Sequence, residues 1–497
     1  MNTPRGAASA DPLELQARGH PDAPALAVGE DTWTYEALDR AAREVAQQLV
    51  DAGLKPGSVI GTLTGATPAA IAAVHGVSRS DVVLAPAHAR WTEGERSTFI
   101  EQLQPDAVLC EPDAALPADD WTARPIHLPA LSDAELLLAQ PGDRSTPRRE
   151  LPDDAHTLVW TSGSEGTPRL VCLGFSAQLH NARASAERVS LGPEDGWLAS
   201  LSLSHVGGLA IVWRTAVVGA RLVLGPRSFD VEHVWAVLNT GRVTHLSVVP
   251  VMLRQLLDLC GTRPAPNTLR CVLVGGDATP VPLVERALER GWPIATTYGL
   301  TEAASQVATA APDLVRAKPG TVGSPLDGVR VRIGTDDRIQ VAGPTVMLGY
   351  VGSESAGTPV REGWLHTGDL GRLDEEGHLW VTGRSADQIV SGGANVDPHE
   401  IEAILFAHEG VRDVAVVGVP DDVWGERVAA IIATDALSAI EPARLESKLR
   451  RWIESRLSGP RRPRLWVFVQ QLPRTPTGKP DVAALRRLAG LAAASGE

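Results

Sequence analysis

The chain has 497 residues, of which 43% are hydrophobic and 21% are charged, and its formal net charge is −14. This length is too great for a single hydrophobic core, so we expect roughly two to four domains. The ordinary globular composition and the net negative charge argue against nucleic acid or an anionic membrane as the main partner.

The cysteines and the apolar segments favour a cytoplasmic protein. Four cysteines are scattered without the spacing of metal ligands, which indicates buried thiols in a reducing compartment. They are Cys110, Cys172, Cys260 and Cys271. Residues 1–11 lack the apolar core of a signal peptide. The longest apolar stretch, residues 209–224, contains two arginines and is too short to span a bilayer.

Helical and strand periodicities alternate along the first part of the chain. We predict helices and strands in turn over residues 34–50, 59–63, 68–77, 82–85, 92–103 and 107–110. This alternation is typical of an α/β fold with doubly wound, mainly parallel sheets. The Pro-, Asp- and Ala-rich stretch from about residue 112 to 153 is interpreted as surface connections.

A loop rich in glycine and hydroxylated residues follows a short apolar strand in the run 157–169, Thr-Leu-Val-Trp-Thr-Ser-Gly-Ser-Glu-Gly-Thr-Pro-Arg. Glycines permit the tight bends in which successive N–H groups bind anions, and Ser and Thr hydroxyls add donors. The pattern lacks the Gly-Lys-Ser/Thr of a Walker loop. We predict a polyphosphate-binding loop, with an ordinary Ser/Gly-rich surface loop as the alternative.

Further strand and helix patterns follow this loop. Helices are predicted over 175–189 and 210–217, and strands over 196–202, 220–224, 243–249 and 271–274. Ligands of parallel sheets bind beyond the carboxyl ends of the strands. We therefore expect three loops to converge on one ligand, at residues 161–169, 204–208 and 275–278.

The segment 295–305 contains three candidate ligand-binding groups. Tyr298 beside a glycine offers a flat face for a purine, Thr301 can donate to a phosphate, and Glu302 is a hard oxygen ligand suited to Mg²⁺. Core packing is the alternative for Tyr298, and a solvated carboxylate is the alternative for Glu302.

From about residue 320 the pattern changes to short strands, over 329–333, 338–342 and 377–382, which predicts a small β-rich subdomain. Asp369 stands between glycines within it and could accept hydrogen bonds from both hydroxyls of a ribose. The alternative for Asp369 is an Asx turn.

Residues 383–388 are predicted to form a hinge, and residues 385–497 a compact α+β domain. Only four of the 46 basic residues are lysines, and Lys479 stands in a Thr-Gly-Lys-Pro run near the C-terminus. A lysine in a chain that otherwise uses arginine suggests that a compact point charge is needed there. Chance retention in an exposed tail is the alternative.

Together these motifs resemble the adenylate-forming superfamily of acyl-CoA synthetases, adenylation domains and luciferases, from about Asp31 to the C-terminus. They are the 161–169 loop, Tyr298-Gly299-Leu300-Thr301-Glu302, Thr367-Gly368-Asp369, Gly383-Arg384 and Gly478-Lys479. The resemblance implies an N-terminal domain over 1–384 and a mobile C-terminal domain over 385–497. It also implies an acid–CoA ligase that uses ATP, Mg²⁺ and coenzyme A and forms an acyl-adenylate.

The resemblance assigns a role to each motif. The ATP phosphates would be held by Thr161, Ser162, Gly163, Ser164, Gly166 and Thr167. Adenine would be held by Gly275, Gly276, Asp277, Ala278, Tyr298 and Gly299, and ribose by Asp369 and Arg384. Thr301 would contact the α-phosphate, Glu302 would bind Mg²⁺, and Lys479 would bridge the acid and the α-phosphate. Gly392 and Gly393 would border the tunnel for the coenzyme A thiol.

A narrower resemblance, carried by residues 201–209, Trp213-Arg214 and 299–306, is to o-succinylbenzoate–CoA ligases of menaquinone biosynthesis. It implies that His205, Arg214 and Ser305 bind the acid, His205 also acting in catalysis; a solvated helix arginine is the alternative for Arg214. A homodimer is a further expectation. Other aryl- or fatty-acid–CoA ligases, carrier-protein-loading enzymes and a non-catalytic nucleotide-binding relative, suggested by Glu165 in the phosphate loop, stay open.

Overall fold

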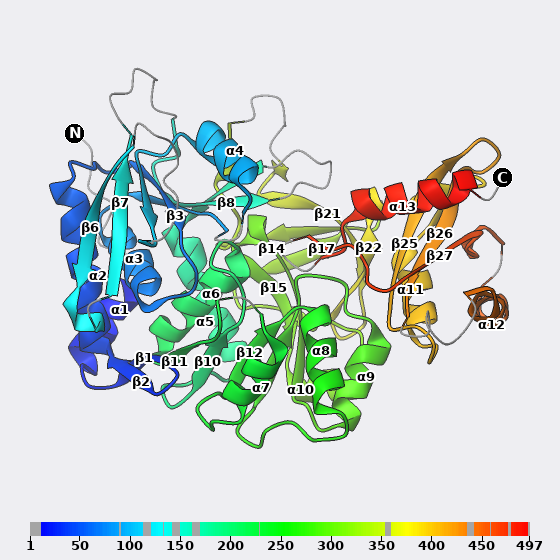
Figure 1. Cartoon of the computed structure of the whole chain (residues 1–497), viewed down its shortest axis with the longest axis horizontal. Helices are drawn as coiled ribbons and strands as arrows, with labels where there is room; N and C mark the ends of the chain where they lie inside the picture. Colours follow the sequence, from blue (N-terminus) through cyan, green and yellow to red (C-terminus); the bar gives the residue numbers. More distant parts are fainter. Residues whose placement is uncertain are drawn as a thin grey trace.

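The computed structural model describes most of the chain, with short gaps. The described residues are 11–88, 91–112, 121–132, 134–141, 150–161, 169–227, 229–352, 359–434, 442–457, 459–475 and 479–495. Within these ranges the chain forms two large sheets, a small β subdomain and a C-terminal α+β domain; in Figure 1 the two large sheets lie at the left and centre and the C-terminal domain at the right.

The first large sheet has eight strands in the order β19-β9-β8-β4-β3-β5-β7-β6. Its centre is parallel and its margins are antiparallel. The strands are β3 (Val59–Leu63), β4 (Val83–Pro86), β5 (Ala107–Cys110), β6 (Thr122–Leu128), β7 (Ala134–Gln140), β8 (Ala155–Thr161), β9 (Arg169–Gly174) and β19 (Gly349–Val351). Three helices accompany it: α2 (Tyr35–Asp51), α3 (Pro68–Arg79) and α4 (Glu93–Leu103). The helices and strands predicted for this part are confirmed.

One prediction in this part is wrong. The stretch interpreted as surface connections contains β6 and β7, an antiparallel pair that extends the sheet from β5. Leu136 and Leu138 of β7 are buried, and β7 pairs with β5 through Leu137, Leu138 and Ala139. The polar and proline-rich residues on either side of the pair concealed these short strands.

The second large sheet has nine strands in the order β16-β15-β14-β13-β12-β10-β11-β1-β2. The run from β14 to β1 is parallel, with antiparallel strands at both ends. The strands are β1 (Pro24–Val28), β2 (Asp31–Thr34), β10 (Gly196–Ala199), β11 (Arg221–Leu224), β12 (His245–Val248), β13 (Cys271–Val274), β14 (Ile294–Leu300), β15 (Ser305–Ala310) and β16 (Ser324–Pro325).

Helices α5 (Phe175–Arg188) and α6 (Val206–Val218) join the two large sheets. A single buried cluster includes residues of α2, α3, α5, α6 and both sheets, so the sheets share one hydrophobic core. The remaining helices of this domain are α1 (Pro12–Gly19), α7 (Val231–Leu238), α8 (Pro250–Cys260), α9 (Val281–Glu289) and α10 (Pro312–Ala317).

The predicted β-rich subdomain is also present. Its strands are β17 (Arg330–Ile333), β18 (Arg338–Ala342), β20 (Val360–Arg361), β21 (Trp364–Leu373) and β22 (Leu379–Arg384). The order is β17-β18-β21-β20, and β22 pairs with β21. Strand β22 leads directly into a short 3₁₀ helix, η3 (Ser385–Asp387), at the expected hinge. Whether the boundary near residue 384 separates two moving bodies stays a prediction.

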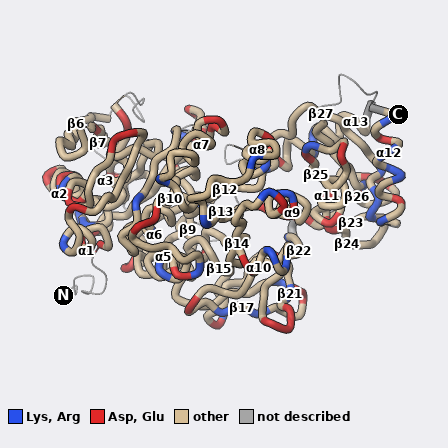
Figure 2. The backbone as a smooth tube through the Cα atoms, turned by 90° about the horizontal axis from the view of Figure 1, so that it is seen from below, with Lys and Arg blue, Asp and Glu red and all other residues tan. Residues whose placement is uncertain are grey.

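The C-terminal domain packs helices around a five-stranded sheet, and Figure 1 shows it at the end of the molecule opposite the N-terminal sheet. Its elements are β23 (Ile389–Ser391), β24 (Ala394–Val396), α11 (Pro398–Phe406), β25 (Asp413–Asp421), β26 (Gly425–Ala433), α12 (Pro442–Glu454), β27 (Leu465–Val469) and α13 (Val482–Ser495). Acidic and basic residues are interspersed along both domains (Figure 2). None of the described helices combines the length and apolar character needed to cross a membrane.

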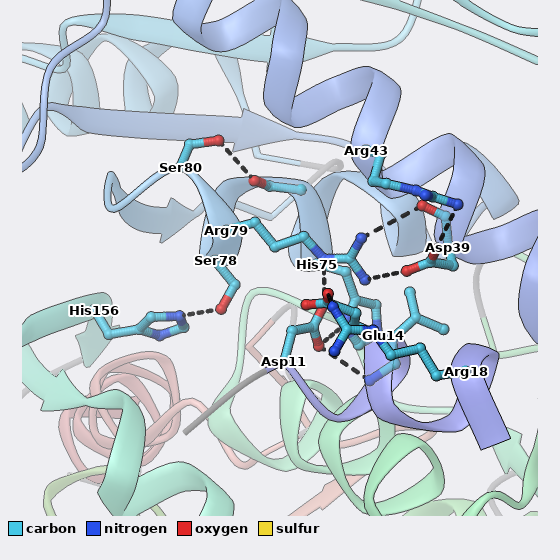
Figure 3. A network of polar contacts seen from close by, with 12 residues as sticks. Asp11, Glu14, Arg18, Asp39, Arg43, His75, Ser78, Arg79, Ser80 and His156 are labelled. Atoms are coloured by element: carbon cyan, nitrogen blue, oxygen red, sulfur yellow. Dashed lines mark hydrogen bonds and ion pairs between the residues drawn. The ribbon is translucent and has the colours of Figure 1, made fainter. Parts of the chain in front are cut away.

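A buried polar network joins the start of α1 to helices α3 and α2 (Figure 3). Asp11 caps α1 by accepting from the Leu13 N–H, and its carboxylate also contacts His75 Nδ1 at 2.9 Å and Arg79 Nε at 2.6 Å. Arg79 continues to Asp39 of α2. Burial alone would raise the pKa of Asp11, but His75 and Arg79 outweigh it and lower the pKa from 3.8 to about 2.

We predict that Asp11→Asn lowers the free energy of unfolding by roughly 2–4 kcal/mol at pH 7, because it leaves Arg79 and His75 without a buried carboxylate. A group with a depressed folded-state pKa stabilises the fold above its unfolded pKa and loses this effect as the pH falls through the folded value. The difference from wild type should therefore shrink below about pH 4 and approach zero near pH 2. Urea denaturation over this pH range measures it.

Glu14→Gln is the matched control, because Glu14 lies on the same helix and pairs with the exposed Arg18. It should change the free energy of unfolding by less than about 1 kcal/mol. Equal effects of the two substitutions would contradict the role given to Asp11.

Candidate active site

The predicted phosphate loop connects two antiparallel strands. Thr161 of β8 pairs with Arg169 of β9, and its hydroxyl donates to the Arg169 carbonyl at 3.3 Å. Residues 162–168 lie outside the described residues, so the predictions for Ser162, Gly163, Ser164, Gly166 and Thr167 remain predictions.

The predicted adenine loop follows the buried strand β13. A Cβ on Gly275 would lie 2.5 Å from Thr297 Cγ2, so glycine is required for β14 to pass this loop closely. Gly276 has φ +83°, a conformation that favours glycine. Asp277 Oδ1 accepts a hydrogen bond from the Ala278 N–H at 2.9 Å. This loop lies at the carboxyl end of its strand, as expected for a ligand-binding loop.

Asp369 is held from two sides in β21. Its Oδ2 accepts from the Tyr298 hydroxyl at 2.6 Å, and its Oδ1 accepts from Arg384 Nε at 2.7 Å. The side chain of Asp369 is buried, and Asp369 faces Arg384 across the β21–β22 pair. The Asx-turn alternative is therefore wrong, because Asp369 lies within a strand.

The Tyr298 hydroxyl is a fixed donor. Burial raises the pKa of Tyr298 well above its ordinary value, and the Asp369 charge raises it further. The hydroxyl therefore stays protonated, and its bond to Asp369 fixes the orientation of the tyrosine ring.

Glu302 lies in a short 3₁₀ helix, η2 (Thr301–Ala303), together with Thr301. The Tyr350 hydroxyl donates to Glu302 Oε1 at 2.9 Å, and burial together with the Glu302 charge raises the pKa of Tyr350 to about 12. Arg169 lies over the Tyr350 ring at 5.3 Å. Tyr350 was not predicted from the sequence as a site residue. Its contacts link Arg169, at the end of the phosphate loop, to Glu302, the predicted metal ligand.

The turn after Glu302 has an unusual backbone. Ala304 and Ser305 have φ of +56° and +122°, which side-chain-bearing residues seldom adopt. A Cβ on Gly299 would lie 2.1 Å from the Ser305 carbonyl oxygen. Gly299 is thus needed for β14 and β15 to approach each other at the point where Thr301 and Glu302 are presented.

His205 is the N-cap of α6, which begins at Val206, earlier than the predicted helix. Its Nε2 is buried and has no hydrogen-bond partner among the described residues. Burial, the neighbouring His88 and the Lys479 charge lower the pKa of His205 to about 4. The imidazole is therefore neutral near pH 7 and can form a hydrogen bond to a bound molecule.

Arg214 does not lie on an accessible surface, so the alternative of a solvated helix arginine is wrong, and its role in binding the acid stays a prediction. Its side chain is 1% exposed, lies over the Trp197 ring at 4.5 Å and donates to Gln306 Oε1 at 3.0 Å. No carboxylate of the described residues lies within ion-pair distance of it. Arg214 is buried because α6 is packed between the two large sheets. Arg214 reaches β15 through Gln306, the residue after Ser305.

Lys479 belongs to the C-terminal domain, but charged residues of the N-terminal domain influence its pKa. Partial desolvation lowers the pKa of Lys479, while the charges of Asp277, Asp369 and Glu302 raise it. Its side chain stays accessible to solvent. The turn that carries it is closed by a 2.8 Å hydrogen bond from the Thr475 N–H to the Lys479 carbonyl. Charged groups predicted for adenine, ribose and the metal thus act on one ammonium, which in turn lowers the pKa of His205, predicted to bind the acid.

Gly392 and Gly393 form the turn between β23 and β24 of the C-terminal domain. Both have positive φ, +58° and +78°, and a Cβ on Gly392 would lie 2.8 Å from Trp424 Cε3. None of the described contacts of this turn involves the groups around Lys479. The role predicted for the two glycines stays a prediction.

A family model described as AMP-binding enzyme matches residues 13–351, and a second, its C-terminal domain, matches residues 400–479. The chain belongs to the AMP-binding enzyme family. The recognition of the superfamily from its motifs is confirmed, as are the α/β fold class and the enzyme class, an AMP-forming CoA ligase.

The chain is 33% identical to a 2-succinylbenzoate–CoA ligase of Bacillus cereus over 94% of this chain and 96% of the relative. It is also similar to solved structures of o-succinylbenzoate CoA synthetase (MenE) from Bacillus subtilis. With the complex containing the acyl-adenylate intermediate OSB-AMP, the TM-score is 0.82 at 28% identity, covering 96% of this chain and 98% of that chain. With a double mutant of the same protein bound with its product analogue OSB-NCoA, identity and coverage are equal but the TM-score is 0.67.

The two solved structures are of the same protein apart from two substitutions, so the lower TM-score reflects a different arrangement of its chain. The arrangement in the present structure is closer to that of the acyl-adenylate complex. This agrees with the position of Lys479 beside the predicted nucleotide groups.

We predict that Asp369→Asn weakens AMP binding by about tenfold or more, because the neutral amide is a poorer acceptor for ribose hydroxyls and leaves Arg384 without its carboxylate. Isothermal titration calorimetry with AMP measures the effect. Asp374→Asn is the control: Asp374 is the residue after β21, and it pairs with Lys318 and not with Tyr298. Unchanged AMP affinity in the Asp369 variant would refute the assignment.

Proposed function

We propose that this chain is an AMP-forming 2-succinylbenzoate–CoA ligase of menaquinone biosynthesis. The observation that carries the proposal is the position of Lys479, an ammonium from one domain within the field of Asp277, Asp369 and Glu302 of the other. The choice of acid rests on the Bacillus relatives of that name, which align with nearly the whole chain.

The first step would join the acid carboxylate to the α-phosphate of ATP and release pyrophosphate. Because both reactants are anions, the main requirement is neutralisation of charge where they meet. Lys479 would supply a positive charge to both, and Thr301 would donate to the α-phosphate. Asp369, fixed by Tyr298 and Arg384, would accept the ribose hydroxyls and so set the position of the nucleotide.

Glu302 fits a magnesium site. Its Oε1 accepts from Tyr350, and Oε2 has no hydrogen-bond donor among the described residues. No group of three or more candidate metal ligands occurs in the described part of the chain. A single carboxylate suits Mg²⁺, which commonly takes its remaining ligands from water and substrate phosphates. The bound ion would offset the phosphate charge.

The second step would bring the thiol of coenzyme A to the acyl carbon and release AMP. Lys479 would leave for this step, because its ammonium is needed only while the acid and the α-phosphate approach each other. A rotation of residues 385–497 about the segment at η3 would remove Lys479 and present the Gly392–Gly393 turn.

The acid would lie beside His205 and Ser305. His205 offers an unpartnered, neutral imidazole nitrogen, and Ser305 lies on the strained turn after Glu302. Arg214 would act as the buried counter-charge for the second carboxylate of a dicarboxylic acid, next to the buried Gln306 to which it donates. A buried arginine without a carboxylate is costly, which favours an anion in its vicinity.

Two finer expectations also belong to the proposal. The chain would act in the cytoplasm, which agrees with its four buried free cysteines. It would form a homodimer, which light scattering on the purified chain tests.

The direct test supplies ATP, Mg²⁺ and coenzyme A with 2-succinylbenzoate, benzoate and a medium-chain fatty acid in parallel, and measures AMP release. We expect 2-succinylbenzoate to give the highest kcat/KM, by about 100-fold or more. A higher value for another acid would replace the substrate. Acyl-adenylate formation without thioester formation on free coenzyme A would favour a carrier protein as acceptor. The absence of pyrophosphate exchange with every acid would favour a non-catalytic relative.

We predict that Lys479→Ala lowers ATP–pyrophosphate exchange by about 100-fold or more but leaves thioester formation from supplied acyl-adenylate within about twofold of wild type. The reason is that the ammonium is needed only while two anions approach each other. Lys448→Ala, in α12 of the same domain, is the control and should affect neither step. Equal losses in both steps would contradict the role of Lys479.

A further inference from the structure

Arg254 of α8 belongs to the N-terminal domain but makes its polar contacts with the C-terminal domain. Its guanidinium pairs with Asp413 Oδ1 at 2.8 Å and donates to the Arg412 carbonyl at 2.6 Å. The side chains of Arg254 and Asp413 are 10% and 14% exposed, so the pair is shielded from solvent. Shielding makes such a pair sensitive to the loss of either partner.

An apolar contact accompanies the ion pair. The Arg254 guanidinium lies over the ring of Phe406, 5.1 Å from its centroid. Phe406 ends α11 and packs against buried clusters of both domains, one around α7, α8 and α9 and one within the C-terminal domain. Arg254 therefore contacts the C-terminal domain at three groups: the Asp413 carboxylate, the Arg412 carbonyl and the Phe406 ring.

The same carboxylate reaches the turn that carries Lys479. Asp413 Oδ2 pairs with Arg474, and Arg474 forms a β-bridge with Pro480, the residue after Lys479. Between them the Thr475 N–H donates to the Lys479 carbonyl. A chain of contacts thus runs from α8 through Asp413 to the catalytic turn.

We propose that Arg254 is a positioning residue for acyl-adenylate formation: by holding Asp413, it keeps the C-terminal domain and the Lys479 turn in the orientation that this step needs. The inference rests on the proposed function for its chemistry. Its structural part, that Arg254 sets the domain orientation, stands on the contacts alone. Because the second step needs another orientation, Arg254 contributes to the first step and not to the second.

Arg254→Gln tests the kinetic part. It should lower ATP–pyrophosphate exchange by about tenfold, since a smaller fraction of molecules holds the competent orientation, and leave thioester formation from supplied acyl-adenylate unchanged or faster. Arg254→Lys, which keeps the charge, should recover part of the exchange rate. Equal losses in both steps, or no loss in either, would overturn the proposal.

Arg290→Gln is the matched control. Arg290 is a partly buried arginine of the same domain that donates to the Leu257 carbonyl of α8 at 2.6 Å, and its described contacts do not include the C-terminal domain. It should change neither step. An Arg290 variant with the same split between the steps as the Arg254 variant would show that a general disturbance of α8 is responsible.

A second measurement does not depend on activity. All four native cysteines are buried, so fluorophores can be attached to cysteines introduced at Val50 of α2 and Leu491 of α13, which are 57% and 71% exposed. In the unliganded full chain, Arg254→Gln should broaden or shift the energy-transfer distribution between the domains, and Arg290→Gln should not. An unchanged distribution in the Arg254 variant would overturn the inference whether or not the chain activates any acid.

Discussion

The chemistry proposed for this protein depends on one electrostatic arrangement. The Lys479 ammonium feels the charges of three carboxylates, those of Asp277, Asp369 and Glu302, and the opposing charge of Arg384, all from the N-terminal domain. A carboxylate and a polyphosphate repel each other, and a mobile positive charge at the point of attack removes that repulsion. The family membership and the higher TM-score with the acyl-adenylate complex of a relative support the proposal that this arrangement serves the first of two steps.

The rest of the fold supports the carboxylates. Asp369 lies in β21 and is fixed by Tyr298 from β14 and by Arg384 from β22, so three segments of the chain determine one side chain. Glu302 is fixed by Tyr350, and the turn beside it is possible only because Gly299 lets β14 and β15 approach closely. Rigid strands hold the groups proposed to bind the nucleotide, and the lysine comes from the domain proposed to move.

Local patterns in the sequence predicted much of this. The continuous apolar run of β13 and the glycines after it predicted a ligand-binding loop, because buried strands and glycine-containing turns have local sequence patterns. The rarity of lysine pointed to Lys479. The short strands β6 and β7 were missed because their flanks are polar and rich in proline.

Other features depend on contacts between distant residues and could not be predicted. The start of α6 contains glycines that favour neither helix nor strand, yet Gly208 is required there because a Cβ would lie 2.1 Å from the Ser202 carbonyl oxygen. Tyr350 meets Glu302 across 48 residues of sequence. The local sequence around Arg214 does not distinguish it from a surface arginine. It is buried because α6 packs between the two large sheets.

The most direct measurement is a crystal structure of the chain with a non-hydrolysable acyl-adenylate analogue of 2-succinylbenzoate. The account predicts the ribose on Asp369 and the Lys479 ammonium within hydrogen-bonding distance of the atoms that replace the α-phosphate and the acyl group. A ribose bound elsewhere, or Lys479 remote from the analogue with the C-terminal domain in its present orientation, would contradict it.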